Sequence, residues 1–214
     1  MNLPASHTET LRQFLGDEFP QWEKANAQPA PVSLRVNPLK WKKEFPAEKV
    51  SWCATGFYLP ERPSFTHDPL FHAGHYYVQE ASSMSIETVF EKYFPERDNL
   101  TVLDLCAAPG GKSTHIVSLL GENSLLVSNE VIRHRANILS ENLAKWGKDN
   151  VVVTNADPSE FSKLEGFFDV ILVDAPCSGE GLFRRDPEAA KEWSPENMEL
   201  CAARQKRILL DVWP

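Results

Sequence analysis

The sequence has few cysteines, no long apolar run and no excess of positive charge. It contains four cysteines, Cys53, Cys106, Cys177 and Cys201, and no two of them have the C-x-x-C spacing. This argues against a disulfide framework or a zinc ribbon and favours a reducing compartment. No stretch approaches the roughly 18 consecutive apolar residues of a membrane span, and no signal peptide pattern opens the chain. We therefore expect a cytoplasmic protein without membrane association.

The formal net charge of −8 argues, taken alone, against a nucleic-acid partner. Basic residues still gather locally, first at Arg35 and Lys40 and again at Arg184 and Arg185. Each such group is interpreted first as solvated surface. The pair Arg184–Arg185 is equally consistent with contacts to nucleic-acid phosphate, which position a protein without specifying a sequence.

The character of the chain changes near residue 99. Residues 1–98 hold most of the prolines and read as a small, turn-rich α+β lobe. From residue 99 to 214, apolar strands alternate with helices, which indicates βαβ units and a parallel sheet covered on both faces. The expected strands cover 101–105, 124–129, 151–154 and 168–174, and the expected helices cover 112–120, 131–147 and 194–212.

The stretch "LDLCAAPGGKST" (103–114) reads as a buried strand followed by small residues and a helix start. A phosphate-binding Walker A loop would need a glycine where Cys106 stands. A dinucleotide fingerprint would need G-x-G-x-x-G, whereas this loop has only the adjacent pair Gly110–Gly111. The third candidate ligand is S-adenosylmethionine, whose amino-acid end needs backbone approach at the first strand–helix turn.

Acidic residues end the predicted strands. Glu130 closes the second strand about 20 residues after Gly110, where an acid can accept hydrogen bonds from ribose hydroxyls. Asp157 follows the third strand, where a carboxylate can accept from an adenine amino group, and Asp104 and Asp174 lie at the ends of the first and fourth strands. Each alone is also a plausible helix cap or turn former, but their common register at the carboxyl ends favours a ligand site.

The loop "DAPCSGEG" (174–181) places Cys177 directly after the fourth strand. A partly exposed thiol there can act as a nucleophile once it is a thiolate, and the alternative is a small buried cysteine. His67, His72 and His75 near Asp68 match no common zinc spacing, so we expect no metal site.

Together, "CAAPGGK" and "DAPCSGEG" closely resemble the RsmF/Sun-type (NOL/NOP/Sun) family of RNA cytosine-C5 methyltransferases. "SLRVNP" near residue 35 and "YYVQEASSM" at 76–84 resemble the N-terminal lobe of that family, and the resemblance runs from about residue 30 to the end. It implies a Rossmann-like class I methyltransferase sheet that binds S-adenosylmethionine, preceded by an RNA-binding-like lobe.

The resemblance also implies roles by position. Glu130 would bind the ribose with support from Arg135, Asp157 would bind the adenine, and Asp174 would bind the methionine ammonium or the target base. The methionine end would lie on the backbone of Cys106, Ala107, Ala108, Pro109, Gly110, Gly111 and Lys112.

Cytosine carbon 5 is a poor nucleophile, so the reaction needs a thiolate that adds to carbon 6. In enzymes similar to this one, a Thr-Cys motif after the fifth strand supplies that thiolate, and the cysteine matched by Cys177 helps to release the product. The 214 residues contain no Thr-Cys pair. We therefore expect an N-terminal fragment that binds the cofactor and is inactive alone.

In such a fragment the fourth strand becomes an apolar sheet edge, which is a liability for pairing with other chains. We expect it to pair with another chain, to be covered by a rearranged segment, or to lower solubility. The expected substrate of the parent enzyme is ribosomal RNA, in preference to transfer RNA. The rival interpretations are a DNA cytosine-C5 methyltransferase with Cys177 as nucleophile and a non-catalytic module that binds cofactor or RNA.

Overall fold

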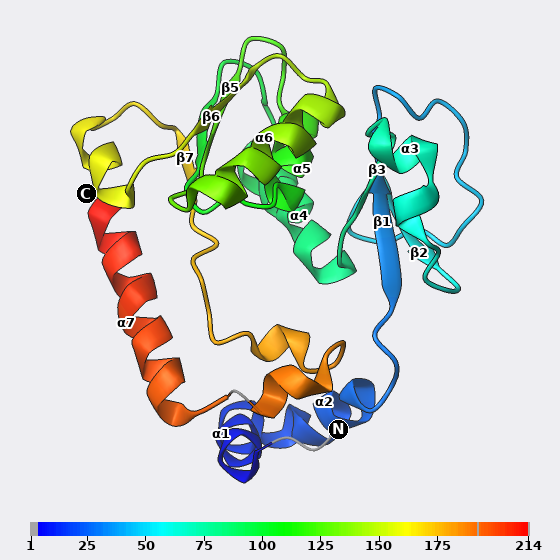
Figure 1. The fold of residues 1–214 in the computed structure, drawn as a ribbon, viewed down its shortest axis with the longest axis vertical. Coiled ribbons are helices and arrows are strands. Elements are labelled where there is room, and N and C mark those ends of the chain that lie inside the picture. Colours follow the sequence, from blue (N-terminus) through cyan, green and yellow to red (C-terminus); the bar gives the residue numbers. More distant parts are fainter. Residues whose placement is uncertain (1–3, 192, 214) are drawn as a thin grey trace. The chain divides into compact units, whose positions relative to one another are not determined.

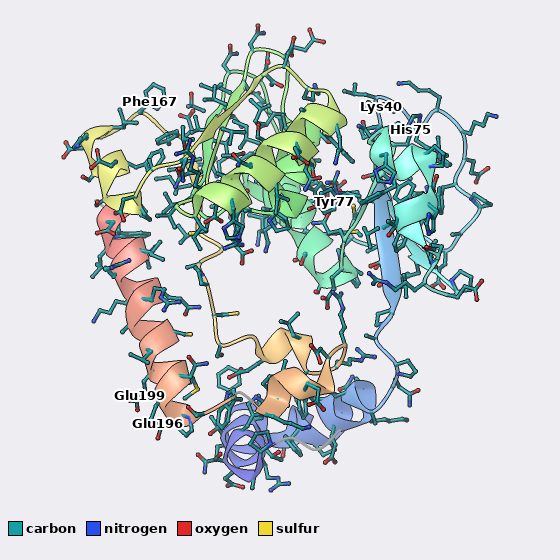
Figure 2. The ribbon with its side chains drawn as sticks, viewed as in Figure 1. Lys40, His75, Tyr77, Phe167, Glu196 and Glu199 are labelled. Carbon is teal, nitrogen blue, oxygen red and sulfur yellow. The ribbon has the colours of Figure 1, made fainter. Side chains whose placement is uncertain are left out.

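The computed structural model describes residues 4–191 and 193–213, and its strands form two separate sheets (Figure 1). The helices are α1 (Ala5–Leu15), α2 (Phe19–Asn26), α3 (Pro69–His72), α4 (Ile86–Tyr93), α5 (Gly111–Leu119), α6 (Arg133–Trp146) and α7 (Pro195–Val212). The strands are β1 (Val32–Val36), β2 (Gly56–Leu59), β3 (Tyr76–Val78), β4 (Thr101–Asp104), β5 (Leu125–Asn129), β6 (Val151–Thr154) and β7 (Val170–Leu172).

The first sheet is small and antiparallel, with strand order β2-β1-β3. In the central strand β1, Leu34 lies opposite both Phe57 and Val78. Leu34 and Phe57 share a buried cluster with Phe65 and Tyr76. Arg35, the alternate residue of β1, faces the other way and is also buried, so this sheet is covered on both faces.

The second sheet is entirely parallel, with strand order β6-β5-β4-β7. Figure 1 shows α4, α5 and α6 grouped on the same side of these strands. There Phe90, Ile116 and Trp146 pack with Val102 and Leu126 of the strands. The opposite face of the sheet buries a second cluster, formed by Leu103, Leu105, Val127 and Ile208. Layers on both faces of a parallel sheet confirm the predicted α/β class and explain the near-continuous apolar strands.

Strand β7 lies at an edge of the parallel sheet and is shorter than predicted. It covers Val170–Leu172, whereas the sequence indicated 168–174. Asp169 instead exchanges hydrogen bonds with Thr101 through its backbone N–H and its carboxylate. The chain has left the sheet by Asp174, whose side chain is exposed.

The described chain divides into two compact units, residues 4–30 with 176–207, and residues 31–175 with 208–213. The second unit contains both sheets. In the first unit, His7 of α1 packs edge-on against the rings of Phe183 and Trp193, with centroids 5.5 and 5.2 Å away. The predicted domains, 1–98 and 99–214, were defined by their type of fold, whereas these two units are defined by their contacts. The predicted boundary at residue 99 therefore stays a prediction.

No helix within the described ranges is both long and apolar enough to span a membrane.

Candidate functional site

Backbone hydrogen bonds hold the loop between β4 and α5, one to the end of β5 and one within the loop. The N–H of Ala107 donates to Asn129 O at 2.8 Å, and the N–H of Gly110 donates to Ala107 O at 2.8 Å. The Ala108–Pro109 peptide bond is cis. Gly110, the residue before α5, has φ +107°, and a Cβ added there would lie 3.1 Å from Leu139 Cδ1. The backbone angle favours glycine at this position, and a larger residue would also press on Leu139.

Helix α6 supplies side chains that fix the loop carbonyls. Arg135 Nη2 donates to Ala108 O at 2.8 Å, and Asn142 Nδ2 donates to Pro109 O at 2.8 Å. Asn142 belongs to no motif of the sequence. Helical spacing could have indicated it, because Asn142 lies seven residues after Arg135 and therefore on the same face of α6.

Glu130 lies just after β5, beside this loop, and is only 4% exposed. Its Oε2 is 3.3 Å from Arg135 Nη1, and its Oε1 accepts the backbone N–H of Ile132 at 2.9 Å. The predicted support of Glu130 by Arg135 is therefore present as an ion pair. Because Arg135 also holds Ala108 O, one guanidinium links the loop to the buried carboxylate.

Asp104 ends β4 and is completely buried. Its Oδ2 accepts the hydroxyl of Ser113 at 2.6 Å, while its Oδ1 has no hydrogen-bond partner among the described residues. Burial raises the pKa of Asp104 to about 6, against the opposing effects of the Ser113 hydrogen bond and the Lys112 charge. The loop base therefore contains an unpartnered acceptor, which is costly unless a ligand or proton satisfies it.

The other predicted loop residues lie in an acidic environment. Lys112 forms an ion pair with Asp174. Burial, followed by the charges of Asp104, Glu130 and Asp174, raises the pKa of Cys106 to about 11. These acids are therefore gathered within electrostatic range of the Cys106 thiol. The same shift keeps that thiol protonated near neutral pH, so Cys106 is unsuited to nucleophilic attack.

Asp157 is exposed and accepts the backbone N–H and the hydroxyl of Ser159 at 3.0 and 2.7 Å. The segment before it is fastened to the end of β5, where Asn155 Nδ2 donates to Glu130 O at 2.6 Å and Asn129 Nδ2 donates to Ala156 O at 3.0 Å. The structure thus places the segment that carries Asp157 next to Glu130. Contact of Asp157 with adenine stays a prediction.

Cys177 is exposed and belongs to the compact unit formed by residues 4–30 and 176–207. The residues of the cofactor loop belong to the other unit. The role of Cys177 beside the cofactor therefore stays a prediction.

One group of potential metal ligands lies within the described residues, away from the histidines weighed in the sequence, and consists of Cys53, Glu87 and His115. His115 Nε2 is 2.9 Å from Glu87 Oε2 and 3.7 Å from Cys53 Sγ. Burial lowers the pKa of His115 to about 4. Burial opposes the ionisation of Glu87, but hydrogen bonds from His115, Cys53 and Ala54 outweigh it and lower the pKa of Glu87 to about 2. A neutral imidazole that donates to a carboxylate accounts for this geometry as a hydrogen-bonded network.

Arg35 corrects the interpretation of the first basic group as solvated surface. Its exposure is 0%. Its guanidinium carbon lies 4.5 Å from the centre of the Trp146 ring, and its Nη2 donates to Thr114 Oγ1 at 2.7 Å. Sequence patterns did not predict this, because a buried cation depends on acceptors that come from distant parts of the chain.

Comparisons with known proteins identify the family of this chain. The profile described as 16S rRNA methyltransferase RsmB/F matches residues 93–214, and the profile for the N-terminal domain of 16S rRNA methyltransferase RsmF matches residues 3–81. Ribosomal RNA small subunit methyltransferase F of Pectobacterium carotovorum is 35% identical over 230 aligned positions, covering 99% of this chain and 47% of the relative. The Aeromonas hydrophila protein of the same name is 40% identical, covering 82% of this chain and 37% of the relative.

Solved structures share the fold. A methyltransferase homologue from Pyrococcus horikoshii is 29% identical with a TM-score of 0.72, covering 92% of this chain and 64% of its own. NSun6 from Pyrococcus horikoshii, solved with SFG, has a TM-score of 0.79 at 17% identity and covers 98% of this chain and 79% of its own.

The chain spans about half the length of the curated relatives it matches. A family profile over more than half of the chain, with two specific loop motifs inside it, settles its membership. The chain belongs to the RsmB/F family of 16S rRNA methyltransferases.

Proposed function

We propose that this chain forms the cofactor-binding part of an RNA cytosine-C5 methyltransferase that uses S-adenosylmethionine. The observation that carries the proposal is the link between Glu130, Arg135 and the loop at Ala108. A buried carboxylate beside a glycine-rich turn at the carboxyl end of a parallel sheet suits a ribose-bearing ligand. We further propose that the protein acts in the cytoplasm on small-subunit ribosomal RNA in preference to transfer RNA, as the names of its relatives suggest.

The described residues fit the proposed cofactor. The backbone of residues 106–112 would hold the methionine end. Glu130 would accept from the ribose hydroxyls and Asp157 from the adenine amino group, while Asp174 would hold the ammonium or the target base. Buried Oδ1 of Asp104 offers a further acceptor at the base of the loop. NSun6, which has a similar fold, was solved with SFG.

Bound S-adenosylmethionine would supply an electrophilic sulfonium methyl group. Carbon 5 of cytosine becomes nucleophilic when a thiolate adds to carbon 6, and after methylation a base takes the carbon-5 proton as the thiolate leaves. The 214 residues contain no Thr-Cys pair to supply that thiolate. Because Cys177 matches the release cysteine of similar enzymes, we assign its exposed thiol to product release. The target base must be unpaired or flipped out of its helix to reach the site.

Photo-crosslinking with tritiated S-adenosylmethionine tests the cofactor class. We expect labelling of the chain that unlabelled S-adenosylhomocysteine suppresses, while NAD and ATP at equal concentration leave it unchanged. Equal suppression by NAD or ATP would contradict the proposal.

Covalent trapping on 5-fluorocytosine oligonucleotides separates the proposal from its rivals. We expect this chain to form no adduct with RNA or DNA, because we assign Cys177 to product release and not to attack on carbon 6. An adduct with DNA that disappears in Cys177→Ser would support a DNA methyltransferase instead. A chain that binds RNA but neither crosslinks to the cofactor nor forms an adduct would support an RNA-binding module.

A further inference from the structure

Arg35 of β1 reaches out of the small sheet to the start of helix α5. Its Nη2 donates to Thr114 Oγ1 at 2.7 Å and to Gly111 O at 3.3 Å, and its Nη1 lies 3.5 Å from Thr114 O. Its Nε donates to Gln79 Oε1 at 2.9 Å. The guanidinium therefore joins Gln79, the residue after β3, to the first turn of the helix that follows the glycine loop.

The contacts of Thr114 extend this link to the loop itself. The Thr114 hydroxyl accepts from Arg35 and lies 2.7 Å from Gly110 O and 3.1 Å from Gly111 O. Arg35 thus acts on Gly111 O directly and on Gly110 O through one hydroxyl. Gly110 is the residue with the positive φ, so the contact reaches the point where the backbone turns.

Fixing these carbonyls also fixes the neighbouring amides. In a planar trans peptide, the C=O of one residue and the N–H of the next point in opposite directions. When Gly110 O and Gly111 O are held toward Thr114 and Arg35, the N–H groups of Gly111 and Lys112 are turned away from them. Those amides belong to the first turn of α5 and have no partner within the helix.

The cost of burying Arg35 shows that its position is specified closely. Burial lowers the pKa of Arg35 to about 10, so the group remains a cation at neutral pH. A buried cation must be satisfied by well-placed acceptors and by stacking, here on Trp146. Lysine has one nitrogen on a flexible chain and cannot span Gln79, Gly111 and Thr114 at once.

We propose that Arg35 is a positioning residue for cofactor binding, because it orients the backbone at Gly110–Lys112 through Gly111 O and the Thr114 hydroxyl. The inference rests on the proposed cofactor and goes beyond it, since it gives the small sheet a part in shaping the cofactor loop.

Asn37, the residue directly after β1, provides a matched control. Like Arg35 it is fully buried, and it lies two residues further along the chain. Its Nδ2 donates to Gly74 O at 2.9 Å and to Trp146 O at 2.8 Å, at the end of α6. Asn37→Ala therefore weakens the attachment of the small sheet without touching α5 or the loop.

The test measures amide hydrogen exchange over residues 106–114 and the Kd for S-adenosylhomocysteine, both well below the melting temperature. Because hydrogen bonds to a charged group are lost in Arg35→Lys, we expect about tenfold faster exchange in the loop and about tenfold weaker binding. Asn37→Ala is expected to lower the melting temperature while leaving loop exchange and Kd within about twofold of wild type.

Thr114→Val keeps the side-chain shape and removes only the hydroxyl. It tests the same contact if Arg35→Lys folds poorly. We expect it to change exchange and Kd in the same direction by about threefold. Equal weakening in Asn37→Ala and Arg35→Lys, or wild-type behaviour of both Arg35→Lys and Thr114→Val, would overturn the inference. A wild-type chain that binds no S-adenosylhomocysteine would overturn the proposed function and this inference with it. In that case loop exchange would still report whether Arg35 fixes the backbone.

Discussion

At the residue scale, Gly110 has a backbone conformation that strongly favours glycine over other residues. Its φ of +107° disfavours any side chain, and an added Cβ would lie 3.1 Å from Leu139 Cδ1. This glycine lets the backbone turn from β4 into α5 within a few residues, so the loop and the buried Glu130 lie side by side.

We predict that Gly110→Ala lowers the free energy of unfolding by about 1–3 kcal/mol and weakens cofactor binding. Chemical denaturation and calorimetry measure the two effects. Gly181→Ala is the control, because nothing lies within 4 Å of the Cβ it would add. Equal stability of the two variants would show that the positive φ at Gly110 is not required.

Asp104 makes stability depend on pH in an unusual direction for a carboxylate. Its pKa is raised to about 6 by burial, so between about pH 4 and pH 6 the folded state binds the proton and the unfolded state does not. Stability from this group is therefore lost as the pH rises through that window and is constant above it.

We predict that Asp104→Asn removes this dependence. Relative to the variant, wild type should lose about 1–3 kcal/mol of unfolding free energy between pH 4 and pH 7. Urea denaturation across that range measures the difference. Asp98→Asn is the control. Hydrogen bonds from Asn123 lower the pKa of Asp98, so its contribution to stability is lost as the pH falls and not as it rises. A pH-independent difference between wild type and Asp104→Asn would contradict the assignment.

At the scale of elements, the order of strands and helices from residue 99 onward was predictable because apolar runs and helical spacing are local signals. Helix α7 was predicted at 194–212 and is found at Pro195–Val212. Strand β7 was predicted too long, because an apolar sequence does not show where the chain leaves a sheet. The buried role of Arg35 and the loop contact of Asn142 were missed, because both depend on partners far away in the sequence.

The edge strand β7 leads to a prediction about association. Ile171 is 39% exposed in the strand, and Phe167 just before it is 49% exposed. An exposed apolar edge is a template for pairing with another chain. We predict concentration-dependent association of the wild-type chain, and a markedly smaller associated fraction in Ile171→Lys.

Analytical ultracentrifugation measures that fraction. Val89→Lys is the control, because Val89 is similarly exposed on helix α4 and does not belong to the sheet edge. A wild-type chain that remains a clean monomer at high concentration, or equal effects of both substitutions, would exclude pairing through β7.

At the scale of the whole molecule, helix α1 packs against the segment that carries Cys177. His7 is 5% exposed and lies against Phe183 and Trp193, and its Nε2 is 3.7 Å from Glu180 Oε2. Glu180 also accepts the indole N–H of Trp193 at 2.8 Å and the hydroxyl of Ser178 at 3.1 Å. No local pattern predicts a contact between segments so far apart in the sequence. A domain boundary predicted from composition therefore could not place these two segments in one unit.

We predict that His7→Ala weakens this unit by about 2 kcal/mol. Limited proteolysis followed by mass spectrometry should then show faster cleavage within residues 176–207, while residues 31–175 stay protected. Phe14→Ala is the control on the same helix, because Phe14 is 84% exposed. Unchanged cleavage in His7→Ala would refute this dependence of the Cys177 segment on α1.

Glu130 is the residue that we expect to accept hydrogen bonds from a ribose-bearing cofactor. Titration calorimetry of S-adenosylhomocysteine into wild type, Glu130→Gln and Glu141→Gln tests this role directly. Glu141→Gln is the control, because Glu141 is an exposed acid on α6 whose Oε2 lies 3.9 Å from Lys145 Nζ. We predict binding by wild type and Glu141→Gln and at least about tenfold weaker binding by Glu130→Gln. Equal affinity in all three proteins, or no binding by wild type, would contradict the account.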